Sequence, residues 1–185
     1  MERVQSARQQ IADYDHGLLW EPEHFSKALG DDLYAAYYTS KFLIGDTAEA
    51  ISNHMNQGFS DSALTAYVEF WGVMQALFIQ QDAIKELYRA IHGMELSIRP
   101  NGSAWQTLRE KRNILVGHPA KKDKPLRRSF MGRIGITYER IQYEQWNADS
   151  GQRTYPIFNL RKLIERYDIE ASEVLTEVLA TMQRR

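Results

Sequence analysis

The sequence predicts a mainly α-helical bundle that carries a small antiparallel sheet and ends on a further helix. Three observations predict this fold class. Apolar residues recur at helical spacing through most of the first 118 residues, apolar and polar residues alternate between about 129 and 158, and helical spacing then continues to Met182. Helices followed by a short alternating segment indicate a bundle with an appended β-hairpin or meander.

The length and composition predict one domain. The chain has 185 residues, of which 43% are hydrophobic and 11% aromatic, enough for a substantial core. No long linker, internal repeat or low-complexity tract divides it. We therefore expect a single domain over 1–185, with a helical core at about 31–119 and a β-hairpin plus C-terminal helix appended over 129–185.

The first part of the chain predicts a first helix at 3–15, a short segment at 21–28, a long helix at 31–56 and another at 61–91. The last of these has the strongest pattern, because aromatic residues broaden its apolar face enough to predict burial around much of the helix. Its apolar stripe consists of Leu64, Val68, Trp71 and Phe78. We expect this helix to be the centre of the bundle.

A shorter helix is expected at 103–117. Ser103 and Gln106 have the spacing of a capping box at its start. Pro119 disfavours the helical conformation of the residue before it, so the helix ends near Gly117. Residues 119–128 then form a basic connector.

The alternating segment predicts extended strands. Apolar residues alternate with glycine or polar residues at 134–138 and again at 141–143. Residues 147–151 form a turn, and a third strand at 154–158 is limited by its proline. Asn159 then caps the last helix.

Composition excludes several classes of chemistry. The chain has no cysteine, so disulfides, thiolate nucleophiles and sulfur-ligated metal centres are excluded. Its five histidines lack metal-ligand spacing, and we expect neither a metal nor a cofactor, because phosphate-binding and dinucleotide motifs are also missing. The charged start and the lack of a long apolar run predict a cytoplasmic protein without a membrane segment.

The charge is distributed unevenly along the chain. The formal net charge is only −1, yet residues 109–133 contain nine basic and two acidic residues, a net of +7 against −8 elsewhere. Such asymmetry predicts a local site for a polyanion, and an ordinary solvated loop is the open alternative. The candidate nucleic-acid-binding residues are Lys121, Lys122, Lys124, Arg127 and Arg128.

An arginine lies within the apolar stripe of the helix at 103–117. At about 100° per residue, Arg112 falls near the centre of the arc formed by Trp105, Leu108, Leu115 and Val116. An unpaired buried guanidinium is costly, so Arg112 needs a partner, a route to solvent or an anionic ligand. Gln75 and Asp82 lie in line with the stripe of the helix at 61–91. Asp82 is the candidate counter-ion, and Arg109 is a second supporting residue.

His118 follows Arg112 by six residues, with Asn113 between them. On a regular helix the two would lie about 240° apart, but Pro119 favours unwinding that brings them together. Histidine exchanges protons near neutral pH, and arginine binds phosphate through two nitrogens. Arg112, Asn113 and His118 are therefore candidate catalytic residues for cleaving a phosphodiester without a metal.

The segment LREKRNILVGHP at 108–119, preceded by a helix rich in aromatic residues and glutamine, resembles the HEPN superfamily. In that family an arginine, usually followed by a polar residue, is separated by four to six intervening residues from a histidine near the end of a late helix. Here five residues intervene and Asn113 is the polar neighbour. The resemblance covers roughly 31–119 and leaves the strand-rich part unexplained.

The resemblance implies a HEPN-like helical bundle that acts as a metal-independent endoribonuclease. It further implies a homodimer in which two Arg–His pairs face one composite cleft, with RNA as substrate. Roles as a toxin or defence effector, with a regulatory protein partner, follow from the same analogy. Ala120 occupies the position of a regulatory tyrosine in some toxin-type members, so we do not expect that regulation here.

The alternative is a non-catalytic helical dimerisation or scaffold module. Many HEPN-like proteins are of this kind, and the basic segment would then bind nucleic acid or an acidic protein partner without cleaving it. Trp105, Tyr143 and Trp146 are candidate base-stacking residues in either case, with packing in the core as the open alternative.

Overall fold

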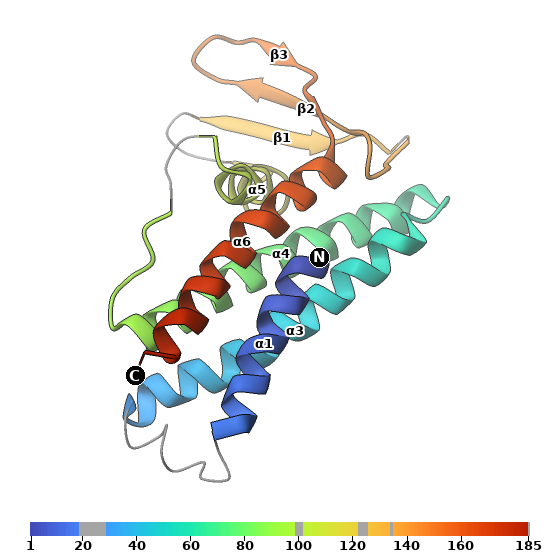
Figure 1. Cartoon of the computed structure of the whole chain (residues 1–185). Coiled ribbons are helices and arrows are strands. Elements are labelled where there is room, and N and C mark those ends of the chain that lie inside the picture. Colours follow the sequence, from blue (N-terminus) through green and yellow to red (C-terminus); the bar gives the residue numbers. More distant parts are fainter. Residues whose placement is uncertain (19–28, 99–101, 122–125, 134, 185) are drawn as a thin grey trace.

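The computed structural model describes residues 1–18, 29–98, 102–121, 126–133 and 135–184 (Figure 1). The helical elements are α1 (Glu2–Leu18), α3 (Asp31–Gln57), α4 (Ala63–His92), α5 (Ala104–Arg112) with the π-helical turn η1 (Asn113–Gly117), and α6 (Leu160–Met182). These bounds agree with the sequence predictions to within a few residues. The helix expected at 21–28 lies outside the described residues. The mainly helical fold class with a small antiparallel sheet is confirmed.

The core lies between four of the helices. α3 and α4 pack along their length, and α1 and α6 lie against them (Figure 1). Ile11 of α1 and Ile164, Tyr167 and Leu175 of α6 are completely buried in the same core cluster as the residues of α3 and α4. The N- and C-terminal helices therefore belong to the same bundle as residues 31–119.

Two carboxylates of α6 bind the starts of two other helices. Asp168 accepts hydrogen bonds from the backbone N–H groups of Arg3 and Val4, at 3.1 and 3.0 Å. Glu170 accepts from those of Ala104 and Trp105, at 2.8 and 2.9 Å. The first N–H groups of a helix lack partners inside it, and the helix dipole favours negative charge there. α6 thereby fixes the position of α5, the helix that carries Arg112.

The buried face of α4 differs from the prediction. Leu64, Val68 and Trp71 of the expected core stripe are 63%, 64% and 41% exposed. The face in the core instead contains Phe70, Met74, Leu77, Ile84 and Leu87. α4 is apolar on both faces, and only one of them meets α3, α5 and α6. The prediction that the stripe is buried is therefore wrong, and a row of large apolar side chains remains exposed.

The small sheet consists of β1 (Arg127–Met131), β2 (Ile141–Asn147), β3 (Arg153–Thr154) and β4 (Ile157–Phe158). β2 is central and pairs antiparallel with each of the other three. The expected third strand is therefore two short strands separated by Tyr155 and Pro156.

The strand expected at 134–138 is wrong for the residues that the structure describes. Residues 135–138 form no strand, and Ile134 lies outside the described residues. Gly135 has a φ of 67°, a left-handed conformation that interrupts an extended chain. β1 instead begins inside the basic connector, where Ser129 and Met131 are buried and Phe130 is exposed. The actual strand thus has the alternation expected of a sheet with one covered face.

The covered face of the sheet lies against η1 and the end of α5. Met131 and Tyr143 are each 3% exposed, and the Lys111 ammonium donates a hydrogen bond to the Tyr143 hydroxyl at 3.0 Å. The sheet therefore sits at one end of the bundle, next to α5 and the start of α6 (Figure 1). In the described part of the chain, no helix is long and apolar enough to cross a membrane.

Candidate functional site

The end of α5 widens into a π-helical turn before the chain reaches His118. The His118 N–H donates to the carbonyl of Asn113, five residues back, at 2.8 Å. His118 itself leaves the helix, with φ −138° and ψ 51°, and its side chain is exposed. The expected unwinding before Pro119 is therefore confirmed. π-helical turns are rare and occur often at functional sites.

Arg112 is held on α4 by uncharged partners. Its terminal nitrogens donate to the Gln75 side-chain oxygen at 3.0 Å and to the Asn113 side-chain oxygen at 3.3 Å. The guanidinium carbon lies 4.1 Å from the centre of the Phe78 ring, a cation–π contact. Nε is buried and has no hydrogen-bond partner among the described residues. Within the described residues, the hydrogen bonds of Arg112 thus leave its charge without a carboxylate.

Gly117 permits the guanidinium to lie against the π-helical turn. A Cβ atom added to Gly117 would be 2.8 Å from an Arg112 terminal nitrogen and 3.4 Å from the guanidinium carbon. Any side chain here would displace the arginine head. Since Gly117 directly precedes His118, this contact brings the Arg112 guanidinium next to the chain that carries His118. The sequence prediction did not identify Gly117 as part of the site.

Asp82 pairs with a different arginine from the one predicted. Its carboxylate accepts a hydrogen bond from Arg109 at 2.7 Å, and the Arg109 guanidinium carbon lies 4.4 Å from the Phe78 ring centre. Phe78 therefore contacts both arginines: Arg109 has a carboxylate partner, and Arg112 has amide partners. The prediction of Asp82 as counter-ion of Arg112 is wrong, because Asp82 lies beside Arg109 and Gln75 occupies the position beside Arg112.

The residues that hold these arginines also line a groove. A hollow of about 570 Å³ lies between α3 and α4, and Gln75, Phe78 and Asp82 are among its lining residues. Gln75 and Phe78 are further site residues that the prediction did not assign. Gln75 and Phe78 lie seven and four residues before Asp82, on the same helical face, and this spacing was the available signal.

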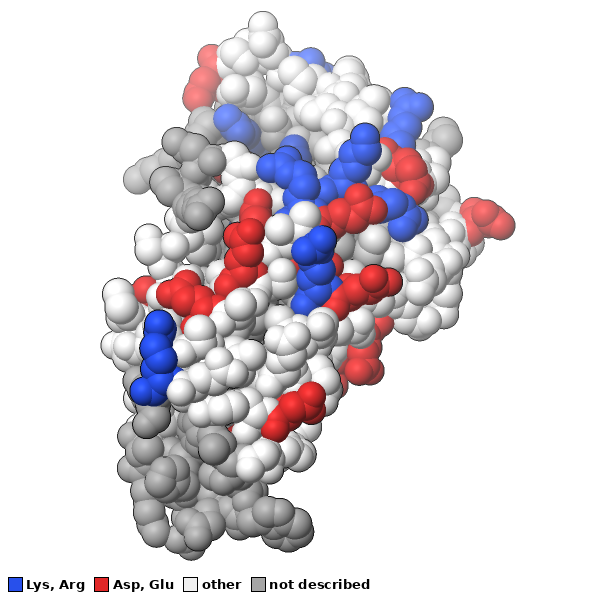
Figure 2. Space-filling model, in the orientation of Figure 1, with Lys and Arg blue, Asp and Glu red and all other residues white. Residues whose placement is uncertain are grey.

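The candidate nucleic-acid-binding residues are described only in part. Lys121 is exposed, and Arg127 and Arg128 lie at the start of β1. The Arg128 guanidinium donates to the Ala120 carbonyl at 2.8 Å and lies over the Trp146 ring, 5.7 Å from its centre. Lys122 and Lys124 lie outside the described residues. On the face drawn in Figure 2, most basic side chains lie in the upper half, towards the sheet of Figure 1.

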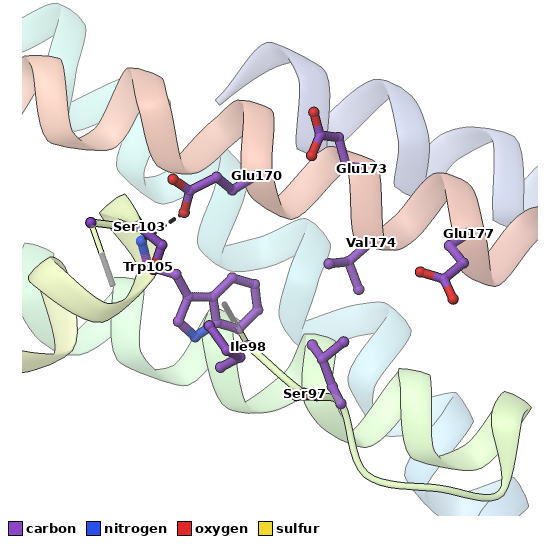
Figure 3. Close-up of a pocket in the computed structure, with 10 residues that line it drawn as sticks. Ser97, Ile98, Ser103, Trp105, Glu170, Glu173, Val174 and Glu177 are labelled. Carbon is purple, nitrogen blue, oxygen red and sulfur yellow. Dashed lines mark hydrogen bonds between the residues drawn. The ribbon is translucent and has the colours of Figure 1, made fainter. Parts of the chain in front are cut away.

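A separate cavity is unsuitable for a polyanion. It has a volume of about 410 Å³ and is walled by Ile98, Trp105 and Val174 together with Glu170, Glu173 and Glu177 (Figure 3). Glu170 is already bound to the start of α5. Three carboxylates around one cavity repel phosphate, so this cavity is distinct in charge from the arginine site. Among the described residues, no three or more His, Asp or Glu side chains are grouped so that they could hold a metal ion.

Comparisons with protein-family models, with curated proteins and with solved structures find no match to this chain. The functional argument therefore rests on the residues themselves. They place an arginine with amide partners and an exposed histidine at the two ends of one π-helical turn, whose first residue is Asn113.

Proposed function

We propose that this protein is a metal-independent endoribonuclease of the HEPN type, with Arg112 and His118 at its active site. One observation supports this proposal above the others. The Arg112 guanidinium is oriented by Gln75, Asn113 and Phe78, none of them charged, and lies against the residue before an exposed histidine. A guanidinium in this setting retains its charge for an anionic ligand.

The chemistry needs a proton acceptor, a proton donor and a charge stabiliser. A 2′-hydroxyl loses its proton to His118 and attacks the neighbouring phosphorus. The bond from phosphorus to the 5′-oxygen then breaks, and that oxygen takes up a proton as it leaves. Arg112 binds the non-bridging oxygens, on which negative charge builds up in the transition state. The products are a 2′,3′-cyclic phosphate and a 5′-hydroxyl end.

Asn113 has a positioning role in this proposal. Its side-chain oxygen accepts from Arg112, while its backbone carbonyl accepts from the His118 N–H. One residue thus contacts both members of the pair. Loss of its side chain leaves the backbone contact and removes one of the two side-chain hydrogen bonds of the guanidinium, so we expect weaker phosphate binding rather than loss of the proton acceptor.

The proposal includes a homodimer. Leu64, Val68 and Trp71 are exposed along one face of α4, and Gln75 and Phe78 continue this row to the arginine site. Rows of exposed large apolar residues mark interaction surfaces. A two-fold contact along this row places two Arg112–His118 pairs at one cleft, so that one histidine can accept a proton and the other can donate one.

Incubation with RNA in excess EDTA tests the proposal. Single-stranded RNA and transfer RNA are each incubated with the wild-type protein, His118→Ala and Arg112→Ala. We expect fragments from the wild type and at least a 100-fold slower rate from each variant, as for the loss of a general base or of a charge stabiliser. Lys162→Ala, on α6, is the matched control.

The possible results separate the two functions that the sequence predicts. Cleavage that either variant retains at the wild-type rate would contradict the proposed active site. Binding without cleavage by the wild type would contradict the nuclease and favour a nucleic-acid-binding module.

A further inference from the structure

The outer face of the small sheet carries aromatic and basic side chains in register. Arg128 of β1 pairs with Trp146 of β2, and Trp146 pairs in turn with Arg153 of β3. One row along, Phe130 of β1 pairs with Glu144 of β2. Since alternate residues of a strand share one face, these five side chains lie on the same face of the sheet. We call this set the outer sheet face.

The core does not account for these aromatic residues. On the opposite face, Met131 and Tyr143 are buried: β1 packs against η1, and Tyr143 accepts a hydrogen bond from Lys111 of α5. Phe130, by contrast, is 56% exposed, and Trp146 is only partly covered. Exposed Phe is unfavourable in water, so its presence on a solvated sheet face indicates a surface that binds something.

The outer sheet face adjoins the chain that leaves the candidate active site. Pro119 and Ala120, the two residues after His118, line one open hollow of about 860 Å³ together with all five residues of the outer sheet face. The Pro119 carbonyl accepts from the Ser129 N–H at 2.8 Å, and the Ala120 carbonyl accepts from the Arg128 guanidinium at 2.8 Å. These bonds fix the sheet to the segment directly after His118.

The chemistry of the outer sheet face matches an unpaired nucleotide. Aromatic rings stack on any nucleobase, and guanidinium groups stack on bases and bind phosphates. Arg128 already lies over the Trp146 ring. Glu144 is 3.8 Å from Arg153 and balances one of the two arginines, which leaves the face with one net positive charge. An antiparallel sheet with exposed aromatic residues is a recurring platform for single-stranded RNA.

We propose that the outer sheet face binds an unpaired base of single-stranded RNA next to the bond cleaved at Arg112 and His118. The inference rests on the proposed ribonuclease function, because it is the position beside His118 that makes this base part of the substrate. Trp146 is the central stacking residue, Phe130 extends the platform, and Arg128 and Arg153 bind the backbone. RNA in which every base is paired has no unpaired base to stack on Trp146, so it binds the outer sheet face more weakly.

Binding of a labelled ten-nucleotide single-stranded RNA, followed by fluorescence anisotropy in EDTA, tests this inference. All proteins carry His118→Ala, so that the RNA stays intact. We expect Trp146→Ala to weaken binding about tenfold, equivalent to about 1.4 kcal/mol. Trp146→Phe, which keeps an aromatic ring, retains most of the affinity. Tyr38→Ala is the control, since Tyr38 is an exposed aromatic residue near the start of α3, and that end of α3 lies at the opposite end of the bundle from the sheet (Figure 1).

A change in the RNA tests stacking without altering the protein. An oligonucleotide of equal length that lacks its bases should bind the His118→Ala protein about tenfold more weakly than the intact RNA does. Adding Trp146→Ala should not weaken the binding of this base-free oligonucleotide further, because the ring and the base form one interaction. Equal binding of the two oligonucleotides, or unchanged affinity in Trp146→Ala, would overturn the platform.

Cleavage by otherwise wild-type proteins distinguishes this inference from the function on which it rests. If Trp146→Ala cleaves RNA with unchanged KM, the platform is wrong and the nuclease stands. If binding depends on Trp146 but the wild type never cleaves, the platform stands as a binding surface and the nuclease is wrong. The expected result is a raised KM with a nearly unchanged kcat.

Discussion

Gly117→Ala separates the geometry of the candidate active site from the stability of the fold. The added methyl group would lie 2.8 Å from an Arg112 terminal nitrogen, whereas ordinary van der Waals contact begins at 3.4 Å. The conflict involves the far end of a flexible side chain rather than the backbone. The guanidinium therefore moves by about 0.6 Å or more, and the helix stays in place.

The size of the effect follows from that displacement. A misplacement of about 1 Å costs roughly 100-fold in rate at a positioned catalytic group, so we expect kcat/KM for RNA to fall about 10- to 100-fold. Loss of one Arg112 hydrogen bond costs about 1 kcal/mol, while alanine stabilises a helix relative to glycine by about 0.5–1 kcal/mol. The net change in the free energy of unfolding is therefore within about 1 kcal/mol of zero.

Two measurements on the same protein check this prediction. Urea unfolding gives the change in stability, and cleavage of single-stranded RNA in EDTA gives the change in rate. Gly17→Ala is the matched control, because Gly17 lies in α1 and a Cβ there meets nothing within 4 Å. Gly117→Ala with wild-type cleavage would refute the role of the Arg112 position. A loss of several kcal/mol of stability would refute the geometric argument.

Three further predictions concern assembly and stability. Val68→Glu should convert the proposed dimer to monomers, as measured by sedimentation velocity. Met94→Glu, at another exposed apolar residue, is the control and should leave the dimer intact. A wild-type protein that is monomeric contradicts the dimer. Asp168→Ala should lower the free energy of unfolding by about 1–3 kcal/mol, because the buried N–H of Val4 and the partly buried N–H of Arg3 lose their acceptor. An unchanged urea midpoint contradicts this. Burial raises the pKa of Tyr167 well above its usual value, so the folded protein keeps a proton that the unfolded chain loses. The contribution of Tyr167 to stability is then constant below about pH 10 and is lost above it. Stability should therefore fall less steeply above about pH 10 in Tyr167→Phe than in the wild type, and equal slopes for the two proteins contradict this.

The helices were predictable because their periodic patterns are long. A departure from regular helix before Pro119 was expected too, but its form as a π-helical turn was not predicted. The buried face of α4 was not predictable. The row through Leu64 and Val68 and the row through Phe70 and Met74 are both apolar, and only the packing of α3, α5 and α6 decides which is covered. Periodicity identifies an apolar face but does not say whether a partner covers it within one chain.

The sequence singles out Arg112, Asn113, His118 and Asp82 as candidate residues, but it does not predict which side chains pair with each other. Gln75 and Asp82 lie on the same face of α4, two turns apart, and both are able to face an arginine of α5. The way the two helices pack sets Gln75 beside Arg112 and Asp82 beside Arg109. Gly117 was not predictable either, since its close approach to Arg112 exists only once the π-helical turn has formed.

β1 was missed because its basic residues suggested a connector. Its side chains do alternate in burial, with Ser129 and Met131 covered and Phe130 exposed. That alternation depends on β1 lying against η1, a tertiary contact that no local pattern specifies. The aromatic and basic residues of the outer sheet face come into register only through this pairing.

The chemical identity of the RNA ends tests the central claim most directly. Single-stranded RNA is incubated in excess EDTA with the wild type and with His118→Ala, and the new termini are analysed by mass spectrometry. The account predicts fragments with 2′,3′-cyclic phosphate and 5′-hydroxyl ends from the wild type and intact RNA from the variant. Fragments with 5′-phosphate ends, or equal cleavage by both proteins, would contradict Arg112 and His118 as the active site.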